Sequence, residues 1–288
     1  MTTPTRSKQI LEANGVDICV ETFGESSDTA ILLIMGSSAT MEWWADEFCE
    51  RLADGPRYVI GYDHRDTGES VSYPPGAPGY TGEDLTCDAL GVLDALELPS
   101  AHLVGLSMGG GVAQELAIDH PDRVESVTLI STSPAVPRPG KSPLPSMSAE
   151  AQARFADISE PDWSDRAAVI DYMVELERAC AGSIPFDETR FRDYAERAYA
   201  RTRNVRSMLT NHDLIHGSGS PKERRLDDIR APALVVHGTE DPLFPHEHGI
   251  ALADEIPGAE LLTVEGMGHE LPNAVWDRVI PAIVEHTR

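Results

Sequence analysis

Residues 101–112 read AHLVGLSMGGGV and predict a strand, a sharp turn and a helix in direct succession. Ala101–Leu106 is a short apolar run, typical of a buried strand. It leads into a G-x-S-x-G pattern centred on Ser107, and the residues beyond continue with helical spacing. Because Gly105 and Gly109 lack a Cβ, strand and helix can approach closely around a strained turn. Such a turn presents the Ser107 hydroxyl at the positive end of a helix and favours a nucleophile over a simple helix cap.

Strand and helix patterns alternate along most of the remaining chain. Apolar runs that predict strands occupy residues 16–23, 30–35, 57–62, 101–106, 124–130, 232–237 and 260–264. Helical spacing occupies residues 43–53, 84–98, 246–255 and 272–286, besides the segment after Ser107. This alternation implies an α/β fold with a mostly parallel sheet and helices on both faces.

The alternation stops between Thr132 and Pro232. About 100 residues separate two strands there, although a crossover needs only roughly a dozen. The stretch opens with the linker SPAVPRPGKSPLPS and continues with helical patterns near 149–156, 164–181, 188–200 and 203–212. We expect an inserted helical cap above the carboxyl edge of the sheet, with core residues 1–133, cap residues 134–228 and core residues 229–288.

Charge and cysteine usage exclude several classes of function. The net charge of −25 disfavours nucleic-acid binding, since acidic surfaces repel phosphates. The four cysteines form no C-x-x-C pair, so neither a disulfide framework nor a zinc site is expected. No secretory h-region and no long apolar span are visible, which makes a cytoplasmic protein without membrane contact the default. No metal and no cofactor are expected, and a homodimer is left open.

A serine nucleophile needs a base and an acid that orients the base. Asp241 follows the strand 232–237 in VHGTEDP, and His269 follows the last strand in VEGMGH. Catalytic groups in such sheets gather beyond the carboxyl ends of the strands, so Ser107, Asp241 and His269 are expected to meet there. Glu240 competes with Asp241 as the acid, but the D-P turn favours Asp241.

An oxyanion hole requires two backbone N–H donors. The residue after the nucleophile, Met108, is expected to supply one of them. The loop MGSS, residues 35–38, is expected to supply the other from Ser37, with Gly36 as the alternative.

Several other polar or aromatic residues have weaker claims to the site. The segment YDHRDTGES, residues 62–70, could hold a metal but is more typical of a tight hydrogen-bonded loop. His212 and His216 lie in the expected cap, where contact with substrate is one interpretation. Apolar candidates for the pocket wall are Trp163, Met173, Phe186 and one of Trp43 and Trp44.

With these motifs in hand, the chain resembles the capped α/β-hydrolase superfamily over essentially its whole length. The motifs that carry the resemblance are MGSS, YDHRDTGES, GLSMGG, PDRVESVTLIST, VVHGTEDPLFP and EGMGHELP. The resemblance implies an eight-stranded sheet with an inserted helical cap. YDHRDTG, DEFCERLADG and GMGHELP are similar to the aclacinomycin methylesterase type, which implies cofactor-free hydrolysis of a methyl ester on a bulky polycyclic substrate. One departure is Met35-Gly36, where the superfamily usually has His-Gly.

The leading hypothesis is therefore a serine carboxylesterase acting on a small to medium apolar ester through an acyl-enzyme. Carbon–carbon bond hydrolases, lactonases, acyl transferases and perhydrolases use the same three side chains and stay open. A third hypothesis, a small-molecule receptor without catalysis, is disfavoured by the intact set of Ser107, Asp241 and His269.

Overall fold

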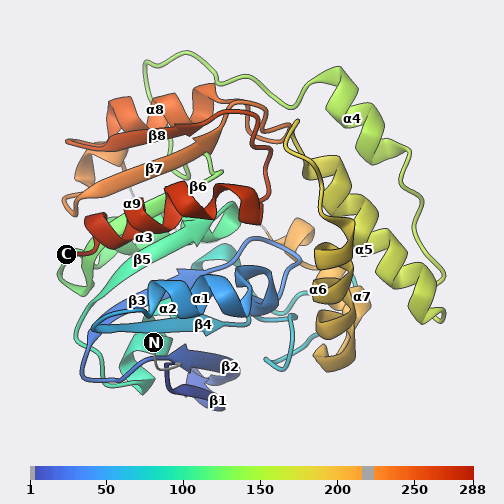
Figure 1. Ribbon diagram of the computed structural model, residues 1–288, viewed down its shortest axis with the longest axis horizontal. Coiled ribbons are helices and arrows are strands. Elements are labelled where there is room, and N and C mark those ends of the chain that lie inside the picture. Colours follow the sequence, from blue (N-terminus) through green and yellow to red (C-terminus); the bar gives the residue numbers. More distant parts are fainter. Residues whose placement is uncertain (1–3, 216–223) are drawn as a thin grey trace.

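The computed structural model describes residues 4–215 and 224–288, which form one twisted sheet with helices around it (Figure 1). The strand order is β1-β2-β4-β3-β5-β6-β7-β8, in which the pairs β1–β2 and β2–β4 are antiparallel and the other five pairs are parallel. This is the expected mostly parallel, eight-stranded α/β-hydrolase sheet. The strands are β1 (Arg6–Ala13), β2 (Val16–Phe23), β3 (Thr29–Ile34), β4 (Arg57–Tyr62), β5 (Ala101–Leu106), β6 (Val124–Ile130), β7 (Ala233–Gly238) and β8 (Glu260–Val264).

Helices cover both faces of the sheet, as the alternating pattern predicts. One face packs against α2 (Gly82–Ala95), α3 (Met108–Asp119) and α8 (Glu247–Glu255). The other packs against α1 (Asp46–Leu52) and α9 (Trp276–His286). The central strand β5 is buried along its whole length, which fixes the turn that follows it.

Strand β1 is absent from the sequence-based expectations, which identify only the other seven strands. Its first five residues, Arg6–Ile10, are exposed, and its sequence RSKQILEA lacks both the apolar run and the clean alternation that signal a strand. The strand exists because it pairs with β2 over its full length, from Arg6 opposite Phe23 to Ala13 opposite Val16.

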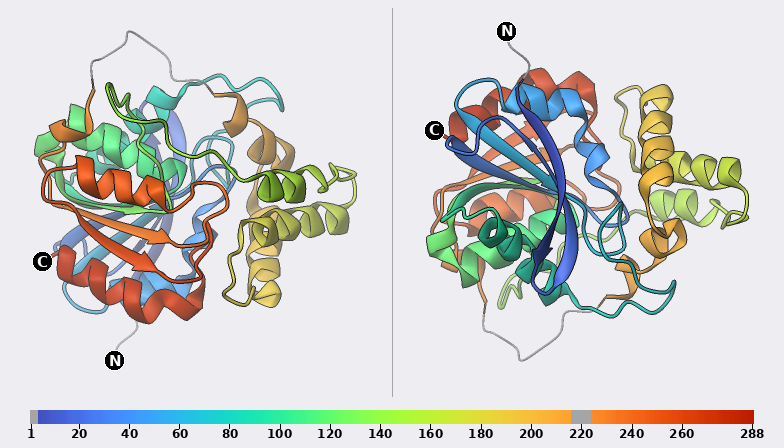
Figure 2. Two further views of the ribbon diagram at one scale, coloured as in Figure 1. Left: turned by 90° about the horizontal axis from the view of Figure 1, so that it is seen from above. Right: turned by 90° about the horizontal axis from the view of Figure 1, so that it is seen from below.

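The helices between β6 and β7 lie together beyond one end of the sheet, where the parallel strands finish (Figures 1 and 2). They are α4 (Ala149–Ala156), α5 (Arg166–Cys180), α6 (Glu188–Arg201) and α7 (Val205–Thr210), and we call them the cap. All four expected helices are confirmed. Each begins at a side chain that accepts a first-turn N–H, namely Ser148, Asp165, Asp187 and Asn204. Apolar residues such as Val169, Met173 and Met208 give the cap a small core of its own.

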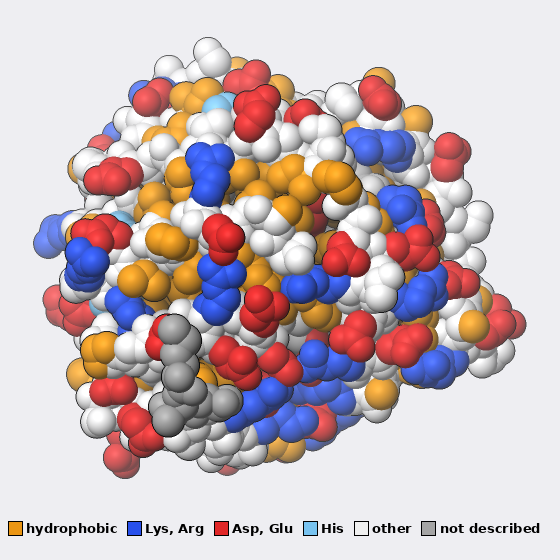
Figure 3. Space-filling model, in the orientation of Figure 1, with side chains coloured by type: hydrophobic (Ala, Val, Ile, Leu, Met, Phe, Trp, Pro, Cys, Tyr) orange, Lys and Arg blue, Asp and Glu red, His pale blue; other side chains and the backbone are white. Residues whose placement is uncertain are grey.

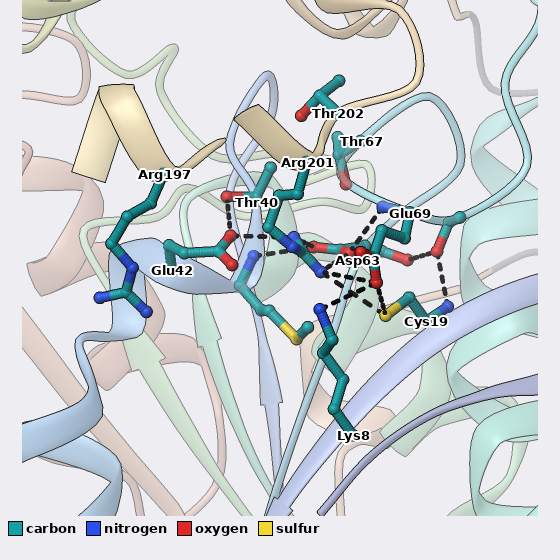
Figure 4. A network of polar contacts seen from close by, with 12 residues as sticks. Lys8, Cys19, Thr40, Glu42, Asp63, Thr67, Glu69, Arg197, Arg201 and Thr202 are labelled. Atoms are coloured by element: carbon teal, nitrogen blue, oxygen red, sulfur yellow. Dashed lines mark hydrogen bonds and ion pairs between the residues drawn. The ribbon is translucent and has the colours of Figure 1, made fainter. Parts of the chain in front are cut away.

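A buried ion-pair network joins the cap to the core (Figure 4). Arg201, the last residue of α6, reaches between Glu42 and Asp63. Its guanidinium nitrogens lie 2.6 and 3.0 Å from the Asp63 carboxylate oxygens and 2.9 Å from Glu42 Oε2. Asp63 also accepts the Met41 and Glu69 N–H groups at 3.1 Å. Asp63 is fully buried directly after β4, and its carboxylate binds both the start of the 3-10 turn η1 (Met41–Trp44) and the cap.

The outer surface mixes both signs of charge. Acidic and basic side chains are interspersed over the face seen in Figure 3. Within residues 4–215 and 224–288, every helix is too short or too polar to cross a bilayer.

Arg201→Met is expected to lower the free energy of unfolding by about 3–5 kcal/mol, because Asp63 stays buried without its cation. Chemical denaturation measures the change. Arg197→Met is the matched control on the same helix: Arg197 pairs with Asp46 at 3.1 Å where both side chains are 36% exposed. That change should cost at most about 1 kcal/mol. Equal losses from the two substitutions would contradict the importance given to the buried pair.

Candidate active site

Ser107 lies in the turn between β5 and α3 with a strained backbone. Its φ of 53° and ψ of −119° are unusual for a residue with a Cβ. The flanking glycines are required by close contacts. A Cβ at Gly105 would lie 2.3 Å from the Gly109 carbonyl oxygen, and one at Gly109 would lie 2.0 Å from the Ile34 carbonyl oxygen. The turn has the form that the sequence pattern predicts.

The three side chains expected to meet form one continuous hydrogen-bonded chain. His269 Nε2 lies 2.9 Å from Ser107 Oγ, and His269 Nδ1 lies 2.9 Å from Asp241 Oδ2. Asp241 follows β7 and His269 follows β8, so the carboxyl ends of neighbouring strands bring them together. Because a carboxylate accepts, Nδ1 of His269 carries the proton, and the lone pair of Nε2 faces the serine hydroxyl.

Backbone groups orient the acid and the base. Oδ1 of Asp241 accepts the N–H groups of Leu243 and Phe244, both at 2.9 Å, and the side chain is fully buried. The N–H of His269 donates to the Cys180 carbonyl oxygen at 2.8 Å, so the end of cap helix α5 supports the loop after β8 that carries His269. Glu240, the competing acid, accepts from the Ser183 hydroxyl at 2.8 Å on the surface and does not contact His269. The structure brings Asp241 rather than Glu240 to the histidine.

The loop expected to stabilise an oxyanion lies directly against Ser107. A Cβ built on Gly36 would be 3.3 Å from the Ser107 Cβ, and Ser37 is exposed beside it on the pocket wall. Met108 is the first residue of α3, where helix geometry leaves the backbone N–H without a partner inside the helix. Ser37 and Met108 therefore both lie close to the serine.

A largely apolar pocket opens over Ser107 and His269 between the core and the cap. Met173 lines it, as expected, and so do both Trp43 and Trp44, where the sequence analysis expected one of the two. Phe186 and Trp163 do not, which corrects the prediction: Phe186 stacks on Phe191 at 4.8 Å, and Trp163 packs edge-on against Tyr172 at 6.1 Å. Wall residues that the sequence analysis missed include Phe155, Leu176, Tyr194, Leu209, Leu243 and Trp276.

Two carboxyl groups in the pocket wall were also missed. Burial raises the pKa of Glu177, whose Oε1 accepts the Trp43 indole N–H at 2.8 Å. Burial likewise raises the pKa of Glu270 to about 8, which leaves this carboxyl mainly neutral at neutral pH. Glu177 lies in no motif that signals a site, and Glu270 follows His269 in GMGHELP, where the sequence analysis assigns a role only to the histidine. The packing of α5 against the loop that carries His269 is what places both carboxyl groups in the pocket wall.

Contact with substrate was one interpretation of His212, and the structure does not place the residue in the pocket wall. The side chain is buried outside the pocket, in the 3-10 turn η3 (His212–Leu214). Its Nδ1 accepts the Ser38 N–H at 2.9 Å, and its Nε2 lies 2.9 Å from the Arg65 carbonyl oxygen. His216 lies outside the described residues.

The motif YDHRDTGES forms a tight hydrogen-bonded loop. Arg65 pairs with the buried Asp88 at 2.7 Å, and Asp66 accepts from the Tyr80 hydroxyl and the Asn211 amide, both at 2.8 Å. His64 Nε2 lies 2.9 Å from the Met35 carbonyl oxygen. These contacts tie the loop to α2, to the cap and to the loop of residues 35–38, which we call the oxyanion loop after its expected role.

Stability is expected to fall as the pH drops from about 6.5 to about 4. Burial lowers the pKa of His64 and of His212 from 6.5 to about 4. In this window the unfolded chain binds protons that the folded chain does not, which costs up to about 1.4 kcal/mol per pH unit for each imidazole. Denaturant unfolding along a pH series measures this dependence. His212→Asn should show a shallower decline than the unaltered chain, and parallel curves would count against the assignment.

Comparison with known proteins agrees with this architecture. The family described as alpha/beta hydrolase fold matches residues 27–272. The chain is 33% identical to rhodomycin D methylesterase DauP of Streptomyces sp. (strain C5) and 32% identical to DnrP of Streptomyces peucetius, each match covering 99% of this chain and 98% of the relative. The solved structure of the meta-cleavage product hydrolase CumD from Pseudomonas fluorescens IP01 is similar with a TM-score of 0.72, at 21% identity over 96% of both chains. The chain therefore belongs to the alpha/beta hydrolase family, as its motifs implied, and is a hydrolytic enzyme.

Proposed function

We propose that the protein is a serine carboxylesterase that hydrolyses a methyl ester through an acyl-enzyme. The observation that carries the proposal is the unbroken hydrogen-bonded chain Ser107–His269–Asp241 at the base of an apolar pocket. The full-length similarity to two proteins named rhodomycin D methylesterase favours a methyl ester among the possible bonds.

The first half of the reaction forms the acyl-enzyme. His269 Nε2 removes the Ser107 hydroxyl proton as Oγ attacks the ester carbonyl carbon. Asp241 holds the imidazole in the required tautomer and stabilises the imidazolium that forms. The Ser37 and Met108 N–H groups donate to the oxyanion of the tetrahedral intermediate. His269 then donates its Nε2 proton to the departing methoxy oxygen, so methanol leaves and the acyl group stays on Ser107.

The second half returns the free enzyme. His269 removes a proton from water, and the hydroxide oxygen attacks the acyl carbon. The intermediate is held by the same two N–H donors. It collapses to the carboxylic acid while Ser107 Oγ recovers its proton from His269. No group beyond these residues and water is needed for either half.

The pocket indicates the kind of acyl group. Indole, phenol and thioether side chains such as Trp43, Tyr194 and Met173 surround the serine, and such walls suit a large apolar or polycyclic ligand. A methoxy leaving group is small, so binding energy must come mainly from the acyl part. This division matches the bulky substrate that the sequence resemblance implies.

Ser107→Ala is expected to lower kcat on a methyl ester by about 10⁴-fold or more, because Ser107 carries the hydroxyl that is hydrogen-bonded to the His269 base. Methanol release from a panel of aromatic methyl esters measures the loss, and circular dichroism checks the fold. Ser164→Ala, in an exposed cap loop, is the matched control and should leave turnover unchanged. A panel that includes lactones and diketones identifies the bond: a chain inert to every ester would overturn the esterase assignment.

The neighbouring acids Asp241 and Glu240 provide a second, sharper comparison. Asp241→Asn is expected to reduce kcat by about 10⁴-fold, because the amide favours the wrong imidazole tautomer. Glu240→Gln should retain near-normal kcat, since that side chain is exposed and accepts a hydrogen bond from Ser183. Steady-state kinetics on the same ester distinguish them, and a larger loss from the Glu240 change would reverse the assignment of the acid.

A further inference from the structure

Two buried imidazoles contact the oxyanion loop on either side of Gly36 and Ser37. On one side, His64 Nε2 lies 2.9 Å from the Met35 carbonyl oxygen. On the other, His212 Nδ1 lies 2.9 Å from the Ser38 nitrogen. His64 comes from the loop after β4, whereas His212 comes from the segment after cap helix α7. The two rings are neighbours, with centroids 6.0 Å apart and planes at 87°.

The partners of these imidazoles fix their tautomers. A carbonyl oxygen only accepts, so His64 carries its proton on Nε2 and donates to Met35. A backbone N–H only donates, so Nδ1 of His212 is unprotonated and accepts from Ser38. The other nitrogen of His212, Nε2, then donates to the Arg65 carbonyl at 2.9 Å. Burial keeps both rings neutral, since it lowers both pKa values to about 4.

The backbone of the loop needs this support. Ser38 has a φ of 58°, in the left-handed region that residues with a Cβ rarely adopt. The hydrogen bond to His212 holds the Ser38 N–H in that conformation. Since Ser37 lies between the two contacted residues, the directions of the Met35 carbonyl and the Ser38 N–H determine where the Ser37 N–H points.

We propose that His64 and His212 are positioning residues which together hold the oxyanion loop so that the Ser37 N–H faces the carbonyl oxygen of an ester at Ser107. The proposal rests on the serine-esterase function argued above. Neither imidazole touches substrate; both act through the loop. We call the pair the imidazole clamp. His212 lies directly after cap helix α7, so docking of the cap is a condition for a formed oxyanion hole.

If the clamp holds the oxyanion loop, its loss should change kcat and KM in a characteristic way. Oxyanion donors act on charge that develops in the transition state, so they must be in place before the reaction begins. A loosened loop should therefore lower kcat and leave KM nearly unchanged, which a general loss of packing around the pocket would not do.

Asparagine and glutamine replacements separate the two nitrogens of each ring. The Asn side-chain oxygen lies near the position of Nδ1, and the Gln amide nitrogen can reach the position of Nε2. His212→Asn keeps an acceptor for the Ser38 N–H, whereas His212→Gln keeps only the donor to Arg65. At the other position the order reverses: His64→Gln keeps the donor to Met35, and His64→Asn loses it.

The test measures kcat and KM for a methyl ester in the full-length chain and in the four variants. We expect His212→Gln and His64→Asn to lower kcat by about ten- to a hundredfold with little change in KM. His212→Asn and His64→Gln should retain most of the activity. Equal losses from Asn and Gln at each position would overturn the clamp, because a simple packing role does not distinguish them.

A second measurement does not depend on the choice of ester. A fluorophosphonate probe reacts when Ser107 Oγ attacks phosphorus, fluoride leaves, and the phosphoryl oxygen occupies the oxyanion hole. The rate of labelling should follow the same order among the four variants. If the unaltered chain is not labelled at Ser107, the proposed function fails; if it is labelled and all variants react equally fast, only the clamp fails.

Nitrogen-15 spectra of the unaltered chain test the clamp without any fold-disturbing change. At neutral pH they should show His212 with Nδ1 unprotonated and Nε2 protonated, and His64 protonated on Nε2 alone. The opposite tautomer at either ring, or a doubly protonated ring, would overturn the proposal.

Discussion

The buried carboxylate of Asp63 is the point on which the arrangement of core, cap and pocket depends. It lies at the end of β4, where it accepts the Met41 N–H and pairs with Arg201 from the cap. A charge so deeply buried is tolerable only when all its partners are in place. The cap and the segment that carries Trp43 and Trp44 therefore take up their positions together, and the pocket between them is defined by one ion pair as much as by apolar contacts.

The strained backbone of Ser107 likewise depends on the residues packed around it. The turn keeps its φ of 53° because glycines at 105 and 109 let backbone atoms approach more closely than any side chain would permit. Its cost is met by the surrounding sheet, since β5 lies at the centre with buried neighbours on both sides. Packing beneath the serine and hydrogen bonds above it therefore hold the site in its geometry before a ligand binds.

Local patterns in the sequence were enough to predict the parts of the site that follow strand ends. Ser107, Asp241 and His269 each come after an apolar run, and parallel strands deliver their carboxyl ends to a common edge. The four cap helices were equally visible, because each combines helical spacing with a capping residue. Strand β1 could not be predicted in this way, because its exposed residues show no periodic pattern. The strand is defined by its pairing with β2.

Several residues whose contacts were not predicted have roles that depend on where the cap docks. Arg201, His212 and Glu177 are polar residues of the inserted segment, and no spacing rule says which of them turns inward. The same limit explains Trp163 and Phe186: helical spacing identifies them as apolar, yet they pack within the cap rather than on the pocket. Long-range docking decides these cases, and a single sequence does not encode it in any local pattern.

Exchange of the cap between related enzymes is constrained by three residues that reach into the core. They are Arg201, Asn211 and His212. A lid without residues equivalent to these would bring no cation for Asp63, no amide for Asp66 and no imidazole for Ser38. Such a chimaera would leave the Asp63 carboxylate buried without its cation, which destabilises the junction between core and cap. The cap therefore supplies both pocket walls and contacts that hold the core loops, so altered selectivity is more readily sought by changing pocket side chains than by swapping the lid.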